Sequence, residues 1–150
     1  MEERTDITDT AGQILKTFDV QKRDIRSFSP LALAFVGDNV FDLVIRTIVA
    51  EKSTGNVSTL HKIKSTMVRA GAQSRMADEI MSLLTEDETA VYKRGRNAKS
   101  HTVPKNADVT DYRKATGVEA LFGYLYLEGR MDRVYELLKK GCRELERYLQ

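Results

Sequence analysis

Two acidic residues, Asp38 and Glu119, each stand in a segment that is otherwise largely apolar. Glu119 is the only charged residue over 115–127, and Asp38 shares the apolar stretch 31–50 with two other charged residues. A carboxylate removed from water without a partner is costly, so such a group needs a cation or several hydrogen-bond donors. Mg²⁺ prefers few carboxylates, several waters and substrate phosphate oxygens. If these two segments are helices that meet in the fold, the two carboxylates favour metal-dependent chemistry on phosphate.

The same two carboxylates also have a structural explanation. Asp38 can pair with Arg46 or with a neighbouring helix, and Glu119 can pair with Arg113 or with a lysine. Gly37 precedes Asp38, and a glycine inside a helix costs up to about 1 kcal/mol relative to alanine. A close neighbour, either another helix backbone or an RNA phosphate, would explain that glycine. From the residues alone, both interpretations of the carboxylates stay open.

Basic residues are concentrated in one short stretch of a nearly neutral chain. The whole chain has a net charge of +2, whereas the segment 93–114 holds seven basic and two acidic residues, a net charge of +5. A local basic block of this kind indicates a polyanion-binding site. A solvated loop explains it equally well.

Helical periodicity runs through nearly the whole chain and predicts an all-α fold, a helical bundle. A first clear helix is expected over 30–50, with Ser29 as its cap and a proline at its first position. A second helix is expected to begin at a Ser58 cap and to reach residue 84. Within it, Gly71 either kinks the helix or permits close packing.

A shorter helix is expected over 86–93, followed by a loop over 94–108 that is rich in glycine, asparagine and proline. Thr110 or Asp111 is expected to cap the next helix, which reaches Leu127 and is ended by Gly129.

Length and composition fit one domain of an ordinary soluble protein, because 150 residues with 41% hydrophobic and 31% charged residues can bury a core. Cys142 is the single cysteine and falls on the apolar face of a last helix expected over 131–149. Residues 1–28 are expected to form a short helix or an ordered arm. The N-terminus does not read as a signal peptide, and 31–50 is too charged for a membrane span. We therefore expect a cytoplasmic protein without membrane contact.

Several segments resemble those of the ribonuclease III family. LALAFVGDNVFDLVIR, residues 31–46, is similar to the signature helix of that family, and ATGVEALFGYLYLEG, residues 115–129, is similar to its second catalytic helix. RGRNAKS (94–100), PKNA (104–107) and YRKATG (112–117) resemble the Mini-III subgroup. The resemblance covers roughly residues 29 to 129, with the segments in the order of the family.

The resemblance implies a metal-dependent endoribonuclease in which Asp38 and Glu119 are the catalytic residues and bind Mg²⁺, with Mn²⁺ able to substitute. Larger members of the family carry four acidic residues around the metals. Ala34 and Thr116 occupy two of those positions here, which puts a full two-metal cage in doubt.

The resemblance also implies the substrate and the assembly. We expect a homodimer that cleaves double-stranded RNA, precursor 23S ribosomal RNA in this subgroup, and leaves 5′-phosphate and 3′-hydroxyl ends. A large-subunit ribosomal protein is a further candidate partner. Residues 1–150 are expected to form one catalytic domain without a separate double-stranded-RNA-binding domain. The residues expected to contact RNA are Arg94, Arg96, Asn97, Lys99, Lys105, Arg113 and Lys114.

Two rival hypotheses keep the basic block without the catalysis. In the first, the chain is a non-catalytic helical RNA-binding domain, and Asp38 and Glu119 form structural ion pairs. In the second, it is a helical interaction module whose basic loop binds an acidic protein. Metal-dependent cleavage of long double-stranded RNA separates the enzyme from both rivals.

Overall fold

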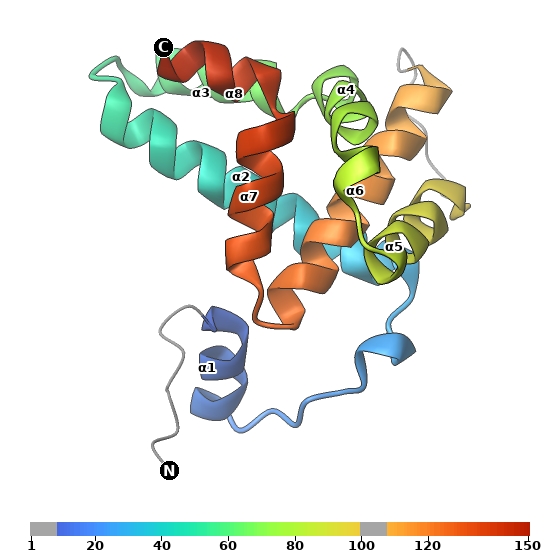
Figure 1. The fold of residues 1–150 in the computed structure, drawn as a ribbon. Coiled ribbons are helices and arrows are strands. Elements are labelled where there is room, and N and C mark those ends of the chain that lie inside the picture. Colours follow the sequence, from blue (N-terminus) through green and yellow to red (C-terminus); the bar gives the residue numbers. More distant parts are fainter. Residues whose placement is uncertain (1–8, 100–107) are drawn as a thin grey trace.

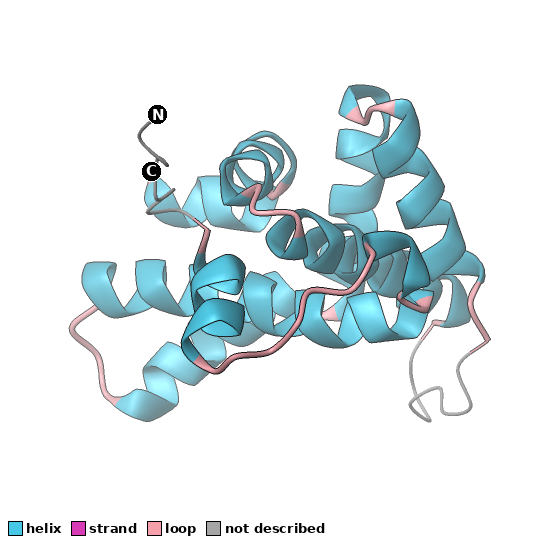
Figure 2. Ribbon diagram, turned by 90° about the horizontal axis from the view of Figure 1, so that it is seen from below, coloured by secondary structure: helices cyan, strands magenta, loops and turns pink. Residues whose placement is uncertain are grey.

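Two long helices cross near the middle of the protein and carry the two acidic residues. In the computed structural model, which describes residues 9–99 and 108–150, α2 spans Pro30–Lys52 and α6 spans Val109–Leu127. The described residues form helices and connecting segments only, as Figure 2 shows. The expectation of an all-α fold is therefore confirmed.

The remaining helices pack around this crossing (Figure 1). Helix α6 contacts α2, α4, α5 and α7, and α3 lies against α2. A short helix α1 precedes the crossing, and an extended segment and the turn η1 connect it to α2. The bounds of the other elements are α1 Thr10–Thr17, η1 Ile25–Ser27, α3 Val57–Val68, α4 Ala70–Ile80, η2 Met81–Leu83, α5 Glu86–Asn97, α7 Met131–Gly141 and α8 Arg143–Leu149.

Local hydrogen bonds set the beginnings of the two central helices. The Ser29 hydroxyl accepts the Ala32 N–H at 3.1 Å, which confirms the predicted start of α2. Asp108, rather than Thr110 or Asp111, caps α6, because its carboxylate accepts the Asp111 N–H at 3.1 Å. In the core, the stacked rings of Phe41 and Phe122, 5.7 Å apart, join α2 to α6.

Two predicted helices are each divided in the structure. The helix expected over 58–84 is two helices and a 3₁₀ turn, with an extended residue, Arg69, between α3 and α4. Its cap is Asn56, which accepts the Thr59 N–H, and not Ser58. The helix expected over 131–149 is interrupted at Cys142, which is buried as predicted. Periodicity missed both breaks because it reports which side chains face the core and not where the chain changes direction.

The loop expected over 94–108 begins later than predicted, because α5 continues to Asn97. Gly95 was a turn signal in the sequence, but in the structure it lies against α6. A Cβ at Gly95 would stand 2.7 Å from the Ala120 Cβ and 3.0 Å from the Gly117 Cα. This glycine permits a close helix contact, so Arg94, Arg96 and Asn97 lie on a helix. In the part of the chain that the structure describes, no helix is long and apolar enough to cross a membrane.

Candidate active site

The crossing of α2 and α6 is held together by two glycines. A Cβ at Gly37 would overlap the carbonyl oxygen of Glu119, and a Cβ at Gly123 would overlap the carbonyl oxygen of Leu33. The backbones therefore touch where any other residue type would keep them apart. Of the two explanations for Gly37, the neighbouring helix backbone is the one that the structure shows. Asp38 follows Gly37, so the same contact brings Asp38 to Glu119.

The carboxyl groups of Asp38 and Glu119 meet at this crossing, close enough to form a hydrogen bond with each other. Burial, the negative charge of Asp38 and the hydrogen bond with Asp38 together raise the pKa of Glu119 from 4.5 to about 8, and burial is the largest of these causes. Ionising both carboxyl groups of such a partly buried pair costs free energy, because the two negative charges repel each other. The site therefore favours either a shared proton or a bound cation.

The structure corrects one part of the sequence interpretation. Glu119 is partly buried, but Asp38 is exposed to solvent, although it lies in a mostly apolar helix. Arg46 pairs with Asp42 at 2.5 Å and not with Asp38. Among the described residues, neither Asp38 nor Glu119 forms a salt bridge within 4 Å. The structural explanation by ion pairing therefore finds no partner there.

The donor set at the crossing fits a hard divalent cation that keeps most of its own water. Two carboxylates face each other, and no group of three or more metal-ligating side chains was found among the residues described. Ala34 is buried and offers no oxygen from its side chain, and the Thr116 hydroxyl donates to the Tyr112 carbonyl oxygen at 3.0 Å. Two carboxylates with water and phosphate oxygens match the preference of Mg²⁺.

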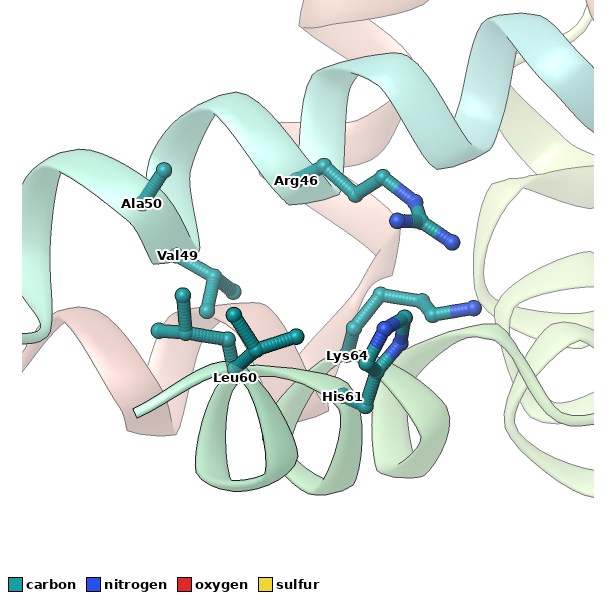
Figure 3. Close-up of a pocket in the computed structure, with 7 residues that line it drawn as sticks. Arg46, Val49, Ala50, Leu60, His61 and Lys64 are labelled. Carbon is teal, nitrogen blue, oxygen red and sulfur yellow. The ribbon is translucent and has the colours of Figure 1, made fainter. Parts of the chain in front are cut away.

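A cluster of charged side chains continues from Asp38 along α2. Asp42 lies one turn after Asp38 and pairs both with Arg46 and, at 3.4 Å, with Lys64 of α3. Arg46 and Lys64 also line a pocket with His61, as Figure 3 shows. Neither Arg46 nor Lys64 is among the residues predicted from the sequence to contact RNA. The four-residue spacing of Asp38, Asp42 and Arg46 was the signal available for this face.

Four of the residues expected to contact RNA gather in one place. Arg96 and Asn97 at the end of α5 and Arg113 and Lys114 near the start of α6 line a common hollow, together with Thr110. The Arg96 Nε donates to Asn97 Oδ1 at 3.2 Å. Because these residues come from two helices that pack together, the hollow is a preformed basic surface and not only a solvated loop.

The other three expected contacts have different positions. Arg94 and Lys99 are exposed at and after the end of α5, and neither lines this hollow. Lys105 lies outside the described residues. Lys114 is partly engaged already, because its Nζ lies 2.6 Å from an Asp78 carboxylate oxygen.

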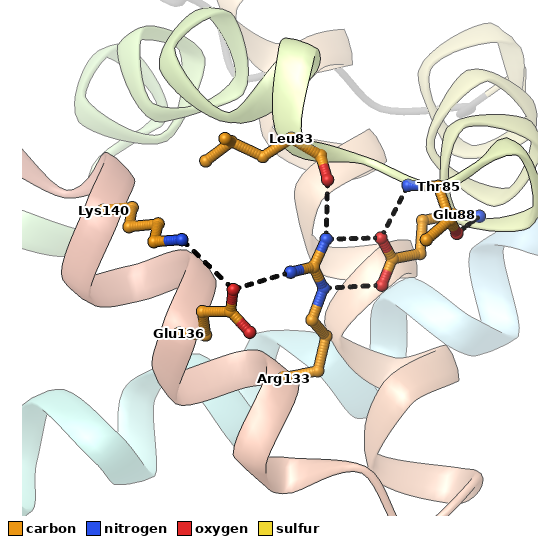
Figure 4. Close-up of polar contacts among 6 residues, drawn as sticks. All are labelled: Leu83, Thr85, Glu88, Arg133, Glu136 and Lys140. Carbon is orange, nitrogen blue, oxygen red and sulfur yellow. Dashed lines mark hydrogen bonds and ion pairs between the residues drawn. The ribbon is translucent and has the colours of Figure 1, made fainter.

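The helix that carries the basic residues is anchored at its other end by a buried ion pair. Glu88 of α5 is 1% exposed and accepts two hydrogen bonds from Arg133 of α7, each 2.9 Å long (Figure 4). Glu88 also completes a capping box with Thr85. Burial acts to raise the pKa of Glu88, but the hydrogen bonds of Arg133 and of the Thr85 N–H lower it below its ordinary value. This cluster fixes the start of α5 and with it the direction of the helix.

Known proteins are similar to this chain over the region that contains α2 and α6. The ribonuclease III domain family matches residues 31–130. The chain belongs to the ribonuclease III family. It is 45% identical to the Mini-ribonuclease 3 of Clostridium tetani over 79% of each chain. It is 44% identical to the Mini-ribonuclease 3 of a Thermoanaerobacter species over 90% of this chain and 95% of that protein.

The fold agrees with a solved structure. A crystal structure of a protein from Fusobacterium nucleatum superposes with a TM-score of 0.72 at 33% sequence identity, over 79% of this chain and 94% of that one. The expected membership in the ribonuclease III family, in its Mini-III subgroup, is thus confirmed, and with it the expectation of an endoribonuclease.

Proposed function

We propose that this chain is an Mg²⁺-dependent endoribonuclease that cleaves double-stranded RNA, with Asp38 and Glu119 as its catalytic residues. One observation carries the proposal: in a ribonuclease III domain, the two carboxylates meet at a glycine crossing, with one of them open to solvent. We infer that both carboxylates bind the metal, and that Mn²⁺ can replace Mg²⁺.

The two carboxylates and the basic residues have different roles in the proposed reaction. A divalent cation, when bound, supplies a Lewis acid that activates water and stabilises charge on the scissile phosphate. Asp38 and Glu119 hold it, and the exposed side of Asp38 leaves room for water and a phosphate oxygen. Arg96, Asn97, Arg113 and Lys114 bind backbone phosphates of the RNA, with Arg94, Lys99 and Lys105 as further contacts. A-form RNA is recognised through shape, phosphates and 2′-hydroxyls.

The natural substrate and the products belong to the same proposal. The resemblance to the Mini-III subgroup supports precursor 23S ribosomal RNA as the substrate and 5′-phosphate and 3′-hydroxyl ends on the products, with a large-subunit ribosomal protein as the partner that presents the RNA. Mapping the termini of precursor 23S RNA after incubation with the protein tests this. Cleavage at scattered positions, or 3′-phosphate ends, would contradict it.

We also propose that the active form is a homodimer. Two apolar side chains of α2 are strongly exposed, Phe35 at 83% and Leu43 at 62%. Leu43 lines a groove that α2 forms with α7 and α8, together with Tyr135 and Leu149. An exposed apolar groove, with a further exposed aromatic side chain on the same helix, is typical of an interface. A second copy covering it would bring two carboxylate pairs to one duplex, one for each strand.

Cleavage of long double-stranded RNA tests the central proposal. Wild-type protein is expected to cleave with Mg²⁺ and to stop when EDTA is added. Asp38→Asn and Glu119→Gln are each expected to lower the cleavage rate by about 100-fold or more, with RNA binding and the circular dichroism spectrum retained. Asp132→Asn, which changes an exposed aspartate of α7, is the matched control and should cleave like wild type.

Two results would favour the non-catalytic alternative. The first is the absence of metal-dependent cleavage by wild-type protein that binds RNA. The second is a loss of melting temperature in Asp38→Asn and Glu119→Gln that is as large as their loss of activity, since that would indicate structural carboxylates.

A further inference from the structure

The pocket between α2 and α3 combines an apolar wall with three nitrogen-bearing side chains. Val49 and Leu60 stand at one end, and the polar ends of Arg46, His61 and Lys64 gather at the other (Figure 3). We propose that this pocket is a second phosphate-binding site for double-stranded RNA, separate from the hollow between α5 and α6. The inference rests on the proposed function, because it assigns a further contact to the same substrate.

The pocket lies on the same face as the carboxylate pair. Asp38, Asp42 and Arg46 are each four residues apart, so they form one stripe along α2. Eight residues of helix place Arg46 about 12 Å beyond Asp38. Lys64 reaches this stripe from α3, since its Nζ lies 3.4 Å from an Asp42 carboxylate oxygen. Because phosphates recur every few ångströms along a nucleic-acid strand, a strand held at Asp38 places another phosphate near Arg46.

The side chains retain donors for such a phosphate. Arg46 uses its Nε on Asp42, and its side chain is 51% exposed, so its terminal nitrogens remain available. Lys64 has three donors, and among the described residues its ion pair is with Asp42. Asp42 holds both cations in place and neutralises one of them, which leaves the cluster with one net positive charge. With only one net positive charge, the cluster is better suited to a phosphate of an RNA strand that is also held elsewhere than to a free phosphate ion. That phosphate would share the donors of Arg46 and Lys64 with Asp42.

The alignment of the pocket with Asp38 favours RNA over an acidic protein. A duplex that is cut at Asp38 extends past the carboxylate pair and so lies along the stripe that leads to Arg46. Binding of an acidic protein does not require a surface next to the carboxylate pair. An acidic peptide that binds the pocket while RNA does not is therefore one of the outcomes that the experiment must distinguish.

Binding of a fluorescent RNA duplex in EDTA, measured by anisotropy at several salt concentrations, tests the inference. Lys64→Met and Arg46→Gln are each expected to weaken binding by about 3- to 10-fold and to reduce the slope of log affinity against log salt by roughly one. Asp42→Asn, which removes the competing carboxylate, is expected to tighten binding. Lys140→Met is the matched control, because Lys140 is also ion-paired, to Glu136 at 3.2 Å, but lies on α7.

Each outcome has a defined meaning. The inference is overturned if Lys64→Met and Arg46→Gln bind RNA as tightly as Lys140→Met does. It is also overturned if these two variants lose affinity for poly-glutamate but keep the wild-type affinity for RNA. If Asp42→Asn does not fold, the other two variants still decide. Failure of the proposed function is distinguishable, because wild-type protein would then show no Mg²⁺-dependent cleavage, whereas failure of this inference alone leaves that cleavage intact.

Discussion

Glu119 shows how a single residue can link a protein's stability to the binding of its ligands. Its carboxyl group is partly buried next to Asp38, and its pKa is raised to about 8 in the absence of a cation. Near neutral pH the site therefore holds a proton that an incoming cation must displace. Metal affinity at such a site rises with pH until the proton is gone.

The raised pKa predicts how stability depends on pH. The folded protein binds the Glu119 proton more tightly than the unfolded chain, so this residue's contribution is fully present below about pH 4.5 and is lost as pH rises through about 8. In EDTA, the melting temperature of wild-type protein is expected to fall relative to that of Glu119→Gln between about pH 5 and about pH 8. Thermal unfolding followed by circular dichroism measures both. Parallel curves for the two proteins would contradict the prediction.

The Asp38–Glu119 pair could be predicted in identity but not in environment. Two acids in apolar segments and a glycine before one of them were visible in the sequence. The exposure of Asp38 was not, because it depends on the angle at which α6 crosses α2, and single-helix periodicity does not determine that angle. For the same reason, the sequence offered Arg46 as a partner of Asp38, although the structure pairs Arg46 with Asp42.

At the scale of elements, the crossing of α2 and α6 determines whether the two carboxylates meet. We expect Gly37→Ala to push the helices apart, because its Cβ would overlap the Glu119 carbonyl oxygen. The predicted cost is about 1–3 kcal/mol of unfolding free energy. Cleavage is expected to fall by about 100-fold, since a displacement near 1 Å can have that effect. Urea denaturation and a cleavage assay measure the two quantities.

Gly71→Ala is the matched control for that prediction. Gly71 also lies in a helix, α4, but the nearest atom to its Cβ would be an Arg75 nitrogen at 3.7 Å, an ordinary contact. Alanine there should stabilise the protein by about 0.5–1 kcal/mol and leave cleavage unchanged. A Gly37→Ala variant as stable and active as Gly71→Ala would show that the close crossing is not required.

The anchoring of α5 gives a second prediction at this scale. Arg133→Met leaves Glu88 buried without its cation and is expected to cost about 3–5 kcal/mol. Arg143→Met removes a comparable pair with Glu79, but both of those side chains are well exposed, so its cost should stay below about 1 kcal/mol. Chemical denaturation compares them. Equal losses would mean that the buried pair contributes no more than a surface pair.

The positions of the helices were largely predictable, and their interruptions were not. Ser29 and Pro30 set the start of α2, and Gly129, two residues after Leu127, marked the end of α6, because these signals act through local backbone geometry. The breaks at Arg69 and Cys142 depend on how α3, α4, α7 and α8 turn to cover the core, which is a tertiary requirement. Gly95 was misinterpreted for the same reason: its role is a contact with α6.

At the scale of the whole molecule, the apolar surface of α2 gives the proposed assembly a direct test. Phe35 is 83% exposed and lies three residues before Asp38 on the same helix, so a second copy that buries it also approaches the carboxylate pair. A buried aromatic anchor contributes about 2 kcal/mol or more to association. Phe35→Glu is therefore expected to raise the dimer dissociation constant by about 30-fold or more, as measured by sedimentation velocity over a range of concentrations.

The Phe35→Glu variant also separates assembly from catalysis. Phe18→Glu changes another exposed phenylalanine, 72% exposed and located after α1, and is expected to remain dimeric. If each subunit cuts one strand, monomeric Phe35→Glu should lose duplex cleavage although its own Asp38 and Glu119 are unchanged, and high protein concentration should restore part of the activity. If the Phe35→Glu variant is monomeric and still cleaves duplex RNA fully, one copy of the chain is sufficient for cleavage. If the Phe35→Glu variant remains dimeric, the interface lies elsewhere on the protein.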